Sequence, residues 1–238
     1  MTNRIGAGLL LIACVALPII IIDYIRIMSG FEGGPDADMA IRAEYAKGVL
    51  PEAARGWLFE SLAIAFIATA GLIFMERKSR AGWALAAVGA LVTMPMYPVM
   101  LGGYTAALNS PEIDVQMFAV LRGIASVVFY IGQGLMMFGF AMVLFLEISV
   151  PDRVLPTWLF ALGVIANAIA GLVFLLLHFG LLSSFMIGGP FGIIGFIVMA
   201  IFAIQLSRRN CQRKVSFKCP VLHSAHDQKS VSLFQNIT

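Results

Sequence analysis

Charged side chains are scarce in this sequence. Lys, Arg, Asp and Glu make up 12% of its 238 residues, whereas an average soluble domain carries about 25%. The net charge is only +3, and it comes mostly from the C-terminal tail, so we expect no nucleic-acid partner. Three cysteines are too few for a disulfide framework, since Cys14 lies in an apolar run and Cys211 and Cys219 lie in a tail expected to be cytoplasmic and reduced.

Most catalytic signatures are missing too. The sequence holds no HExxH, no GxSxG and no Walker loop, and no second histidine within the apolar runs accompanies His178 to ligate a haem. Gly132-Gln133-Gly134 lacks the strand that a dinucleotide-binding loop needs, and helix packing explains it better. The long apolar runs leave no room for a separate catalytic domain. We therefore expect a non-enzymatic protein with no metal and no cofactor.

What the sequence has is six apolar stretches, each long enough to cross a hydrocarbon core about 30 Å thick. They predict an all-α polytopic membrane protein, a bundle of six transmembrane helices. The expected spans are Ile5–Met28, Trp57–Met75, Ala81–Leu108, Val115–Ile148, Pro156–Phe179 and Ser184–Leu206. The first could be read as a signal peptide, with Leu11–Cys14 as a lipoprotein cleavage box. Because its apolar run continues to Ile22, we interpret it as an uncleaved helix.

The basic residues favour one side of these spans, which predicts the orientation. With the N-terminus inside, eleven Lys and Arg fall inside and four outside, and Arg122 lies at the edge of the fourth span. The inside set is Arg4, Arg77, Lys78, Arg80, Arg153, Arg208, Arg209, Arg213, Lys214, Lys218 and Lys229; the outside set is Arg26, Arg42, Lys47 and Arg55. Both termini are therefore expected in the cytoplasm. The three tryptophans, Trp57, Trp83 and Trp158, fall at span ends, where such rings prefer the headgroup level.

Two segments outside the spans have appreciable length. In the expected outer loop, residues 29–56, Asp38 is expected to cap a short helix that ends near Lys47, and Pro51 to begin the approach to the second span. The tail, residues 207–238, is basic and without periodicity, so we expect it to be disordered.

Small residues and prolines mark the expected packing faces. Glycines and alanines recur four apart in the third and fifth spans, which favours close helix contacts. Pro18, Pro95 and Pro98 are expected to bend or loosen their helices. The glycine-rich segment Gly188–Gly195 has two readings, a packing face or a broken helix that lines a transport path.

Ionisable and polar residues gather toward the outer ends of several spans. A charge inside a membrane is costly and is a candidate functional group by default. Helical spacing also aligns polar side chains with these charges along the third, fourth and fifth spans. The candidate ligand-binding residues are Asp23, Arg26, Glu60, Tyr97, Tyr104, Arg122, Ser126, Tyr130, Gln133, Asn167 and His178.

Two interpretations of this cluster stay open. If the polar stripes face one another, the bundle holds a polar cavity that opens outward. Alternatively, Asp23 and Arg26 pair on one helix face, Arg122 extends to the headgroups, and the remaining polar groups join helices or lie at the interface.

The N-terminal Arg-Ile-Gly-Ala-Gly-Leu-Leu-Leu-Ile-Ala, a long outer loop and the segment Pro156–Val164 occur together in this chain. Over residues 4–209 the chain resembles bacterial families of uncharacterised six-helix membrane proteins. The resemblance implies the fold and little else, since these families have no agreed catalytic residues to carry over. We expect the chain to lie in a bacterial cytoplasmic membrane.

Three functions follow as hypotheses. The leading one is an accessory or sensor-like binding component, whose partner besides the lipid bilayer is a small amphipathic ligand or a membrane-protein complex. A small-solute transporter and a purely structural subunit of a larger membrane complex are the alternatives.

Overall fold

The computed structural model describes residues 2–34, 37–151, 153–182 and 188–216, and it contains helices and no strand within those ranges. Six helical stretches in it have the length and apolar composition needed to cross a membrane. They are α1 (Thr2–Ser29), α2 (Met39–Ile73), an interrupted third span from Arg80 to Leu108, α6 (Val115–Ile148), α7 (Thr157–His178) and α8 (Gly189–Ser216). The expected all-helical architecture is confirmed for the described residues, with six helical stretches that could cross a membrane.

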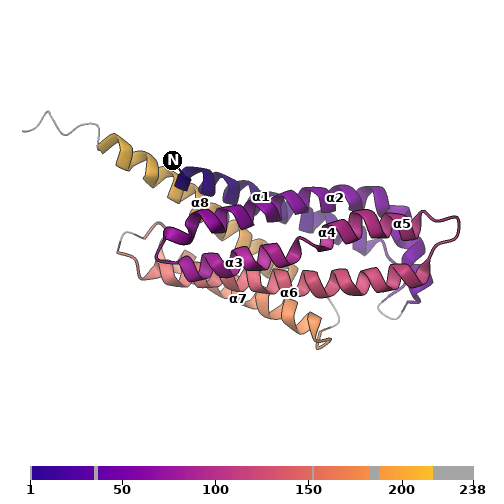
Figure 1. The fold of residues 1–238 in the computed structure, drawn as a ribbon. Coiled ribbons are helices and arrows are strands. Elements are labelled where there is room, and N and C mark those ends of the chain that lie inside the picture. The colour runs from indigo at the N-terminus through magenta and orange to yellow at the C-terminus, as the bar shows by residue number, and fades with distance from the viewer. Residues whose placement is uncertain (1, 35–36, 152, 183–187, 217–238) are drawn as a thin grey trace, which may run out of the picture.

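The contacts between the six stretches join them into a closed ring. Helix α1 packs on α2 and α8, α2 packs on the third span, the third span packs on α6, and α7 joins α6 to α8. The N-terminus, the α2–α3 and α6–α7 loops and the end of α8 lie at one end of the bundle, called here the terminus end (Figure 1). The opposite end, called here the loop end, holds the α1–α2 loop and the α5–α6 loop.

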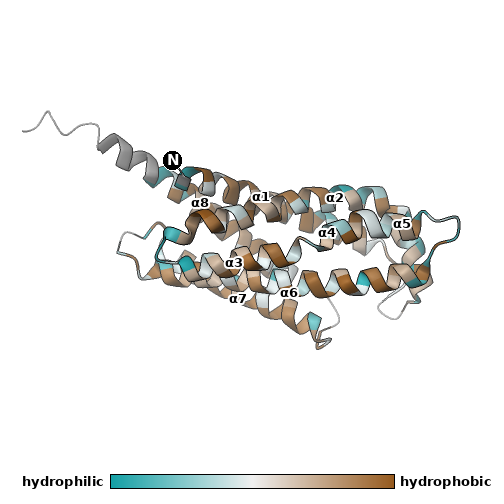
Figure 2. Cartoon of the chain, viewed as in Figure 1, coloured by the Kyte–Doolittle hydropathy of each residue, from teal (hydrophilic) through white to brown (hydrophobic). Residues whose placement is uncertain are grey.

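The outer surface of the ring is apolar over most of its length. Figure 2 shows hydrophobic residues along the helices and hydrophilic residues toward the loops at both ends. Large aliphatic and aromatic side chains in mid-helix are half exposed or more, including Ile12, Ile19, Phe59 and Ile165. In water such a surface would be costly, whereas in lipid it is the expected one.

Helix α2 differs from the expected second span. Asp38 does cap a helix, since its carboxylate accepts a hydrogen bond from the Ala40 backbone N–H at 3.2 Å. The expectation that this helix ends near Lys47 is wrong, because α2 runs without a break from Met39 through Pro51 to Ile73. Most of the expected outer loop is therefore the first half of a 35-residue helix, about 52 Å long at 1.5 Å per residue.

The third span is interrupted where its prolines predicted. Helix α3 (Arg80–Thr93) stops before a turn at Met94 and Pro95, and α4 (Met96–Pro98) leads into a π-helical segment, η2 (Val99–Tyr104), and α5 (Thr105–Leu108). Proline lacks the N–H that a regular α-helix would use and crowds the preceding turn. The backbone therefore changes its helical phase between Thr93 and Tyr104, close to the loop end.

Close backbone contact joins α3 and α6. A Cβ on Gly82 would lie 2.6 Å from the backbone nitrogen of Val143, and one on Gly89 would lie 2.6 Å from the carbonyl oxygen of Gly132. Residues larger than glycine would push these helices apart. Packing thus explains Gly82 and Gly132, as the sequence predicted, and Gly89 shares the same interface.

The terminus end holds a buried ion pair that the sequence reading missed. The Arg77 guanidinium donates to both carboxylate oxygens of Glu147 at 3.1 Å, and the Ser79 hydroxyl donates to the same carboxylate at 2.8 Å. The Glu147 side chain is only 3% exposed. This cluster ties the α2–α3 loop to the last turn of α6.

Two of the three tryptophans are not at a lipid-facing surface. Trp83 is fully buried among Phe74, Phe140 and Phe202, and Trp57 is nearly buried at the loop end. Only Trp158, 66% exposed, is placed as an interfacial ring would be. Helix α8 continues ten residues past the predicted end of its span, and residues 217–238 of the predicted tail lie outside the described residues.

Candidate functional site

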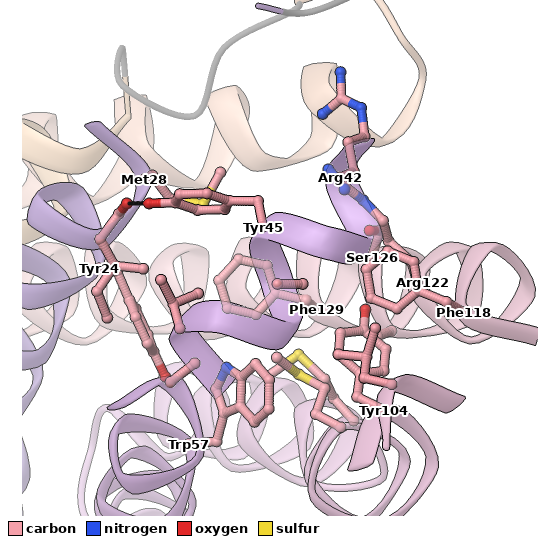
Figure 3. Close-up of a pocket in the computed structure, with 18 of the residues that line it drawn as sticks. Tyr24, Met28, Arg42, Tyr45, Trp57, Tyr104, Phe118, Arg122, Ser126 and Phe129 are labelled. Carbon is pink, nitrogen blue, oxygen red and sulfur yellow. Dashed lines mark hydrogen bonds between the residues drawn. The ribbon is translucent and has the colours of Figure 1, made fainter. Parts of the chain in front are cut away.

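A pocket of about 330 Å³ lies toward the loop end, between α1, residues 42–60 of α2, the α4–α5 region and α6. Its volume falls at the lower end of the range typical of small-molecule sites, about 300–1,000 Å³. Its lining is mostly apolar. Aromatic side chains come from all four walls, and methionines come from α1 and the α4–α5 region. Figure 3 shows Tyr24 and Tyr45 on one side of it and Arg42, Arg122 and Ser126 on the other.

Five of the predicted site residues line this pocket. Glu60 reaches it from α2, Tyr104 from the end of the π-helical segment, and Arg122, Ser126 and Tyr130 from one face of α6. The four- and eight-residue spacings from Arg122 put its α6 neighbours on the same stripe. The structure therefore brings together residues from three separate spans. The sequence grouped Glu60 and Arg122 by depth and added the other three by helical spacing. Whether they bind a ligand stays a prediction.

Glu60 is the most deeply buried charged residue of the pocket lining, with 5% of its surface exposed. It accepts a hydrogen bond from the Tyr24 hydroxyl on α1 at 2.9 Å. A buried carboxyl without such a partner would cost several kcal/mol, on the order of the desolvation of an unpaired polar group. The contact therefore stabilises the packing of α1 against α2 and holds the carboxyl at the pocket wall.

The other predicted residues lie elsewhere. Asp23 and Arg26 form an exposed ion pair on α1, with 2.9 Å between the Arg26 guanidinium and the Asp23 carboxylate, as the pairing interpretation expected. Tyr97 is buried beside Glu60 without reaching the pocket, and its hydroxyl makes no hydrogen bond of ordinary geometry within the described residues.

Two predicted amides are buried inside the bundle. Gln133 lies one turn below Tyr130 on α6 and does not line the pocket. The Asn167 side chain donates to the Gly163 carbonyl at 2.7 Å and packs against Gly195 of α8. His178 ends α7 and stacks edge-on against Phe179. Asn167 thus packs between helices, and none of the three residues lines the pocket, which takes in fewer of the predicted residues than the cavity that the sequence suggested.

The pocket also has residues that sequence reasoning missed. Tyr24, Arg42, Tyr45 and Trp57 line it, and Phe31 closes it from the α1–α2 loop. Arg42 is held in place by hydrogen bonds to the carbonyls of Ala37 and Gly34. A prediction that α2 starts at Met39 would have identified Arg42 and Tyr45 as candidates, because helical spacing puts them on one face with Trp57.

No protein-family model, curated protein or solved structure matches this chain. The resemblance to uncharacterised six-helix bacterial proteins therefore stays a prediction. Among the described residues, no group of three or more His, Cys, Asp or Glu side chains is placed to hold a metal ion.

Proposed function

We propose that this chain is a non-enzymatic, multi-pass protein of a bacterial cytoplasmic membrane that binds a small amphipathic ligand in the loop-end pocket. It acts as an accessory or sensor-like component, and its termini face the cytoplasm. The observation that carries the proposal is the pocket itself, an apolar cavity with Arg122 and Glu60 in its walls. Apolar walls with a few placed polar groups are typical of sites for small organic ligands.

The depth of the pocket supports an amphipathic ligand. Helix α6 has 34 residues and is about 51 Å long, so it extends beyond a hydrocarbon core about 30 Å thick. Arg122 lies about two turns from the start of α6, about 10 Å along the axis. A ligand in this pocket would therefore lie across the boundary between headgroups and hydrocarbon.

The proposal is tested by asking what the protein retains in a mild detergent. We expect mass spectrometry of the purified chain to find one defined small molecule or lipid at near-stoichiometric amount. Ala46→Trp places a large ring in the pocket and should abolish retention, whereas Ala40→Trp, on the exposed side of the same helix, should not. Equal retention by both variants, or a stoichiometric protein partner with no small molecule, would count against the proposal and favour a structural subunit.

A transporter is the second candidate, and the interrupted third span favours it. Broken helices next to a binding site are typical of secondary transporters, and α4 and the π-helical segment supply Met96, Met100 and Tyr104 to the pocket. In reconstituted vesicles, a transporter would produce ion flux that depends on added solute. A binding component would retain its ligand and produce none.

A further inference from the structure

The α6 wall of the pocket carries polar groups that the protein leaves without partners. The Arg122 guanidinium is half-buried, and within the described residues it forms no ion pair and no hydrogen bond. The hydroxyls of Ser126, Tyr130 and Tyr104 donate no hydrogen bond to any described residue either. One cation and three hydroxyl donors thus face the same cavity, and each gains free energy from an acceptor that enters it.

The carboxylate that could neutralise Arg122 is held elsewhere. Glu60 is bonded to Tyr24 on the α1 side of the pocket and makes no ion pair with Arg122. An unpaired guanidinium beside an apolar cavity favours an anion, because low polarity strengthens the attraction between opposite charges. The planar fork of arginine also matches the oxygens of a carboxylate or a phosphate.

The remaining walls suit a flexible apolar chain. Met28, Met96 and Met100 are adaptable side chains that fill irregular space, and Phe31 and Phe129 add aromatic surface. We infer that the pocket binds a single-chain amphiphile with an anionic headgroup, whose carboxylate or phosphate lies on Arg122, Ser126, Tyr104 and Tyr130 and whose chain lies against the methionines. This inference rests on the proposed function and names its ligand class.

Trp57 in the pocket lining provides a reporter for the test. The protein is reconstituted in phosphatidylcholine nanodiscs with the exposed Trp158 changed to Phe, so that lipid-side quenching is small. Dodecanoate, dodecyl phosphate, dodecanol and dodecylamine, each with a brominated chain, are titrated while tryptophan fluorescence is recorded. We expect the two anions to quench at concentrations at least tenfold lower than the alcohol and the amine. Trp57→Phe in the same background leaves only Trp83, which is buried outside the pocket, and its residual quenching defines the blank.

The charge requirement is tested by Arg122→Gln. We expect it to weaken quenching by the two anions about tenfold or more, in line with the loss of a charged hydrogen bond, and to change quenching by dodecanol less than twofold. Arg55→Gln, an exposed arginine of α2 outside the pocket, should match the parent protein. Thermal unfolding of each variant shows that the fold is retained.

Each contrary result has its own meaning. If none of the four amphiphiles quenches Trp57, the proposed function itself fails. If dodecanol or dodecylamine binds as tightly as dodecanoate, or if Arg122→Gln leaves the preference unchanged, the pocket binds amphiphiles and the inference about the anion is wrong. If acetate or inorganic phosphate displaces brominated dodecanoate at equal concentration, the site is one for soluble anions, and the single-chain amphiphile is overturned.

Discussion

The hydrogen bond between Tyr24 and Glu60 connects α1 to α2, and both side chains also line the pocket. The carboxyl is nearly buried and its partner comes from another helix, so removing either group leaves the other without its bond. Unpaired buried groups cost more than the bond itself contributes, because the lost hydration is not recovered. The same contact therefore matters for stability and for the shape of the pocket.

Tyr24→Phe should lower the free energy of unfolding by about 1–2 kcal/mol, since it deletes the donor and leaves the Glu60 carboxyl buried. Ser61→Ala is the matched control on α2, because the Ser61 hydroxyl bonds only the Leu58 carbonyl at an exposed position, and its loss should cost less than about 0.5 kcal/mol. Denaturant titration in detergent measures both. Equal stability of Tyr24→Phe and the parent would show that Glu60 finds another partner.

The Arg77–Glu147 pair at the terminus end predicts a larger effect. Arg77→Met leaves the Glu147 carboxylate with Ser79 as its one described donor, and we expect a loss of about 3 kcal/mol. The double variant Arg77→Met/Glu147→Met should recover part of that loss, because it removes the unpaired charge as well. Arg26→Met breaks only exposed ion pairs, with Asp23 and with Glu52, and should cost less than about 1 kcal/mol. A double variant as unstable as the sum of its single changes would contradict this account.

The sequence identified some of these side chains and not others, for a physical reason. Glu60 and Arg122 stand out because charge within an apolar run is rare, and the structure places both in one pocket. Arg77 and Glu147 look like ordinary loop charges, because nothing in the sequence shows that a loop folds back over the end of α6. Asn167 stands out equally in the sequence and is buried between helices, since hydropathy does not tell a pocket from a packed interface.

At the scale of single helices, the contact between α3 and α6 depends on glycines, because a residue without a Cβ lets the two backbones approach closely. Gly89 and Gly132 face each other across it, and so do Gly82 and the backbone of Val143. In lipid, helices associate by close packing because water supplies little drive between them. A methyl group here therefore changes the distance between two whole helices.

Gly89→Ala should destabilise the bundle by about 1–3 kcal/mol through overpacking, because its Cβ would lie 2.8 Å from the Met136 Cα. Gly123→Ala on α6 is the control, since a Cβ there meets no atom within 4 Å. It should keep or raise stability, as alanine favours helix by about 1 kcal/mol over glycine. Thermal unfolding in one detergent compares the two. If both variants melt together, backbone contact does not limit this interface.

The helices themselves show where sequence reasoning fails. Hydropathy locates α6 and α7 well because their apolar runs end sharply at polar loops. It places the start of α2 far too late, because residues 39–56 are polar enough to look like a loop and contain Pro51. Tertiary contacts with α1 hold that segment helical, and a proline at an exposed position is tolerated there.

At the scale of the whole molecule, the even number of spans brings the start of α1 and the end of α8 to the same end of the bundle. Both the N-terminus and the end of α8 lie at the terminus end of the bundle (Figure 1). Arg77, Lys78 and Arg153 lie in the loops of that end and Arg80 begins α3 there, whereas the α5–α6 loop at the opposite end carries Glu112 and Asp114. Positive loops stay in the cytoplasm during insertion. The pocket would then open toward the outer face.

Single cysteines test the prediction that the terminus end faces the cytoplasm and the loop end faces outward. In a variant with the native cysteines replaced, Glu112→Cys in the α5–α6 loop should react with a membrane-impermeant maleimide on intact cells. Lys78→Cys in the α2–α3 loop should react only after the membrane is opened. Both positions are exposed, so accessibility differs only by side. The reverse pattern would place the pocket in the cytoplasmic leaflet, where its anionic ligand would have to come from inside the cell, because a charged headgroup crosses the hydrocarbon core only at high cost.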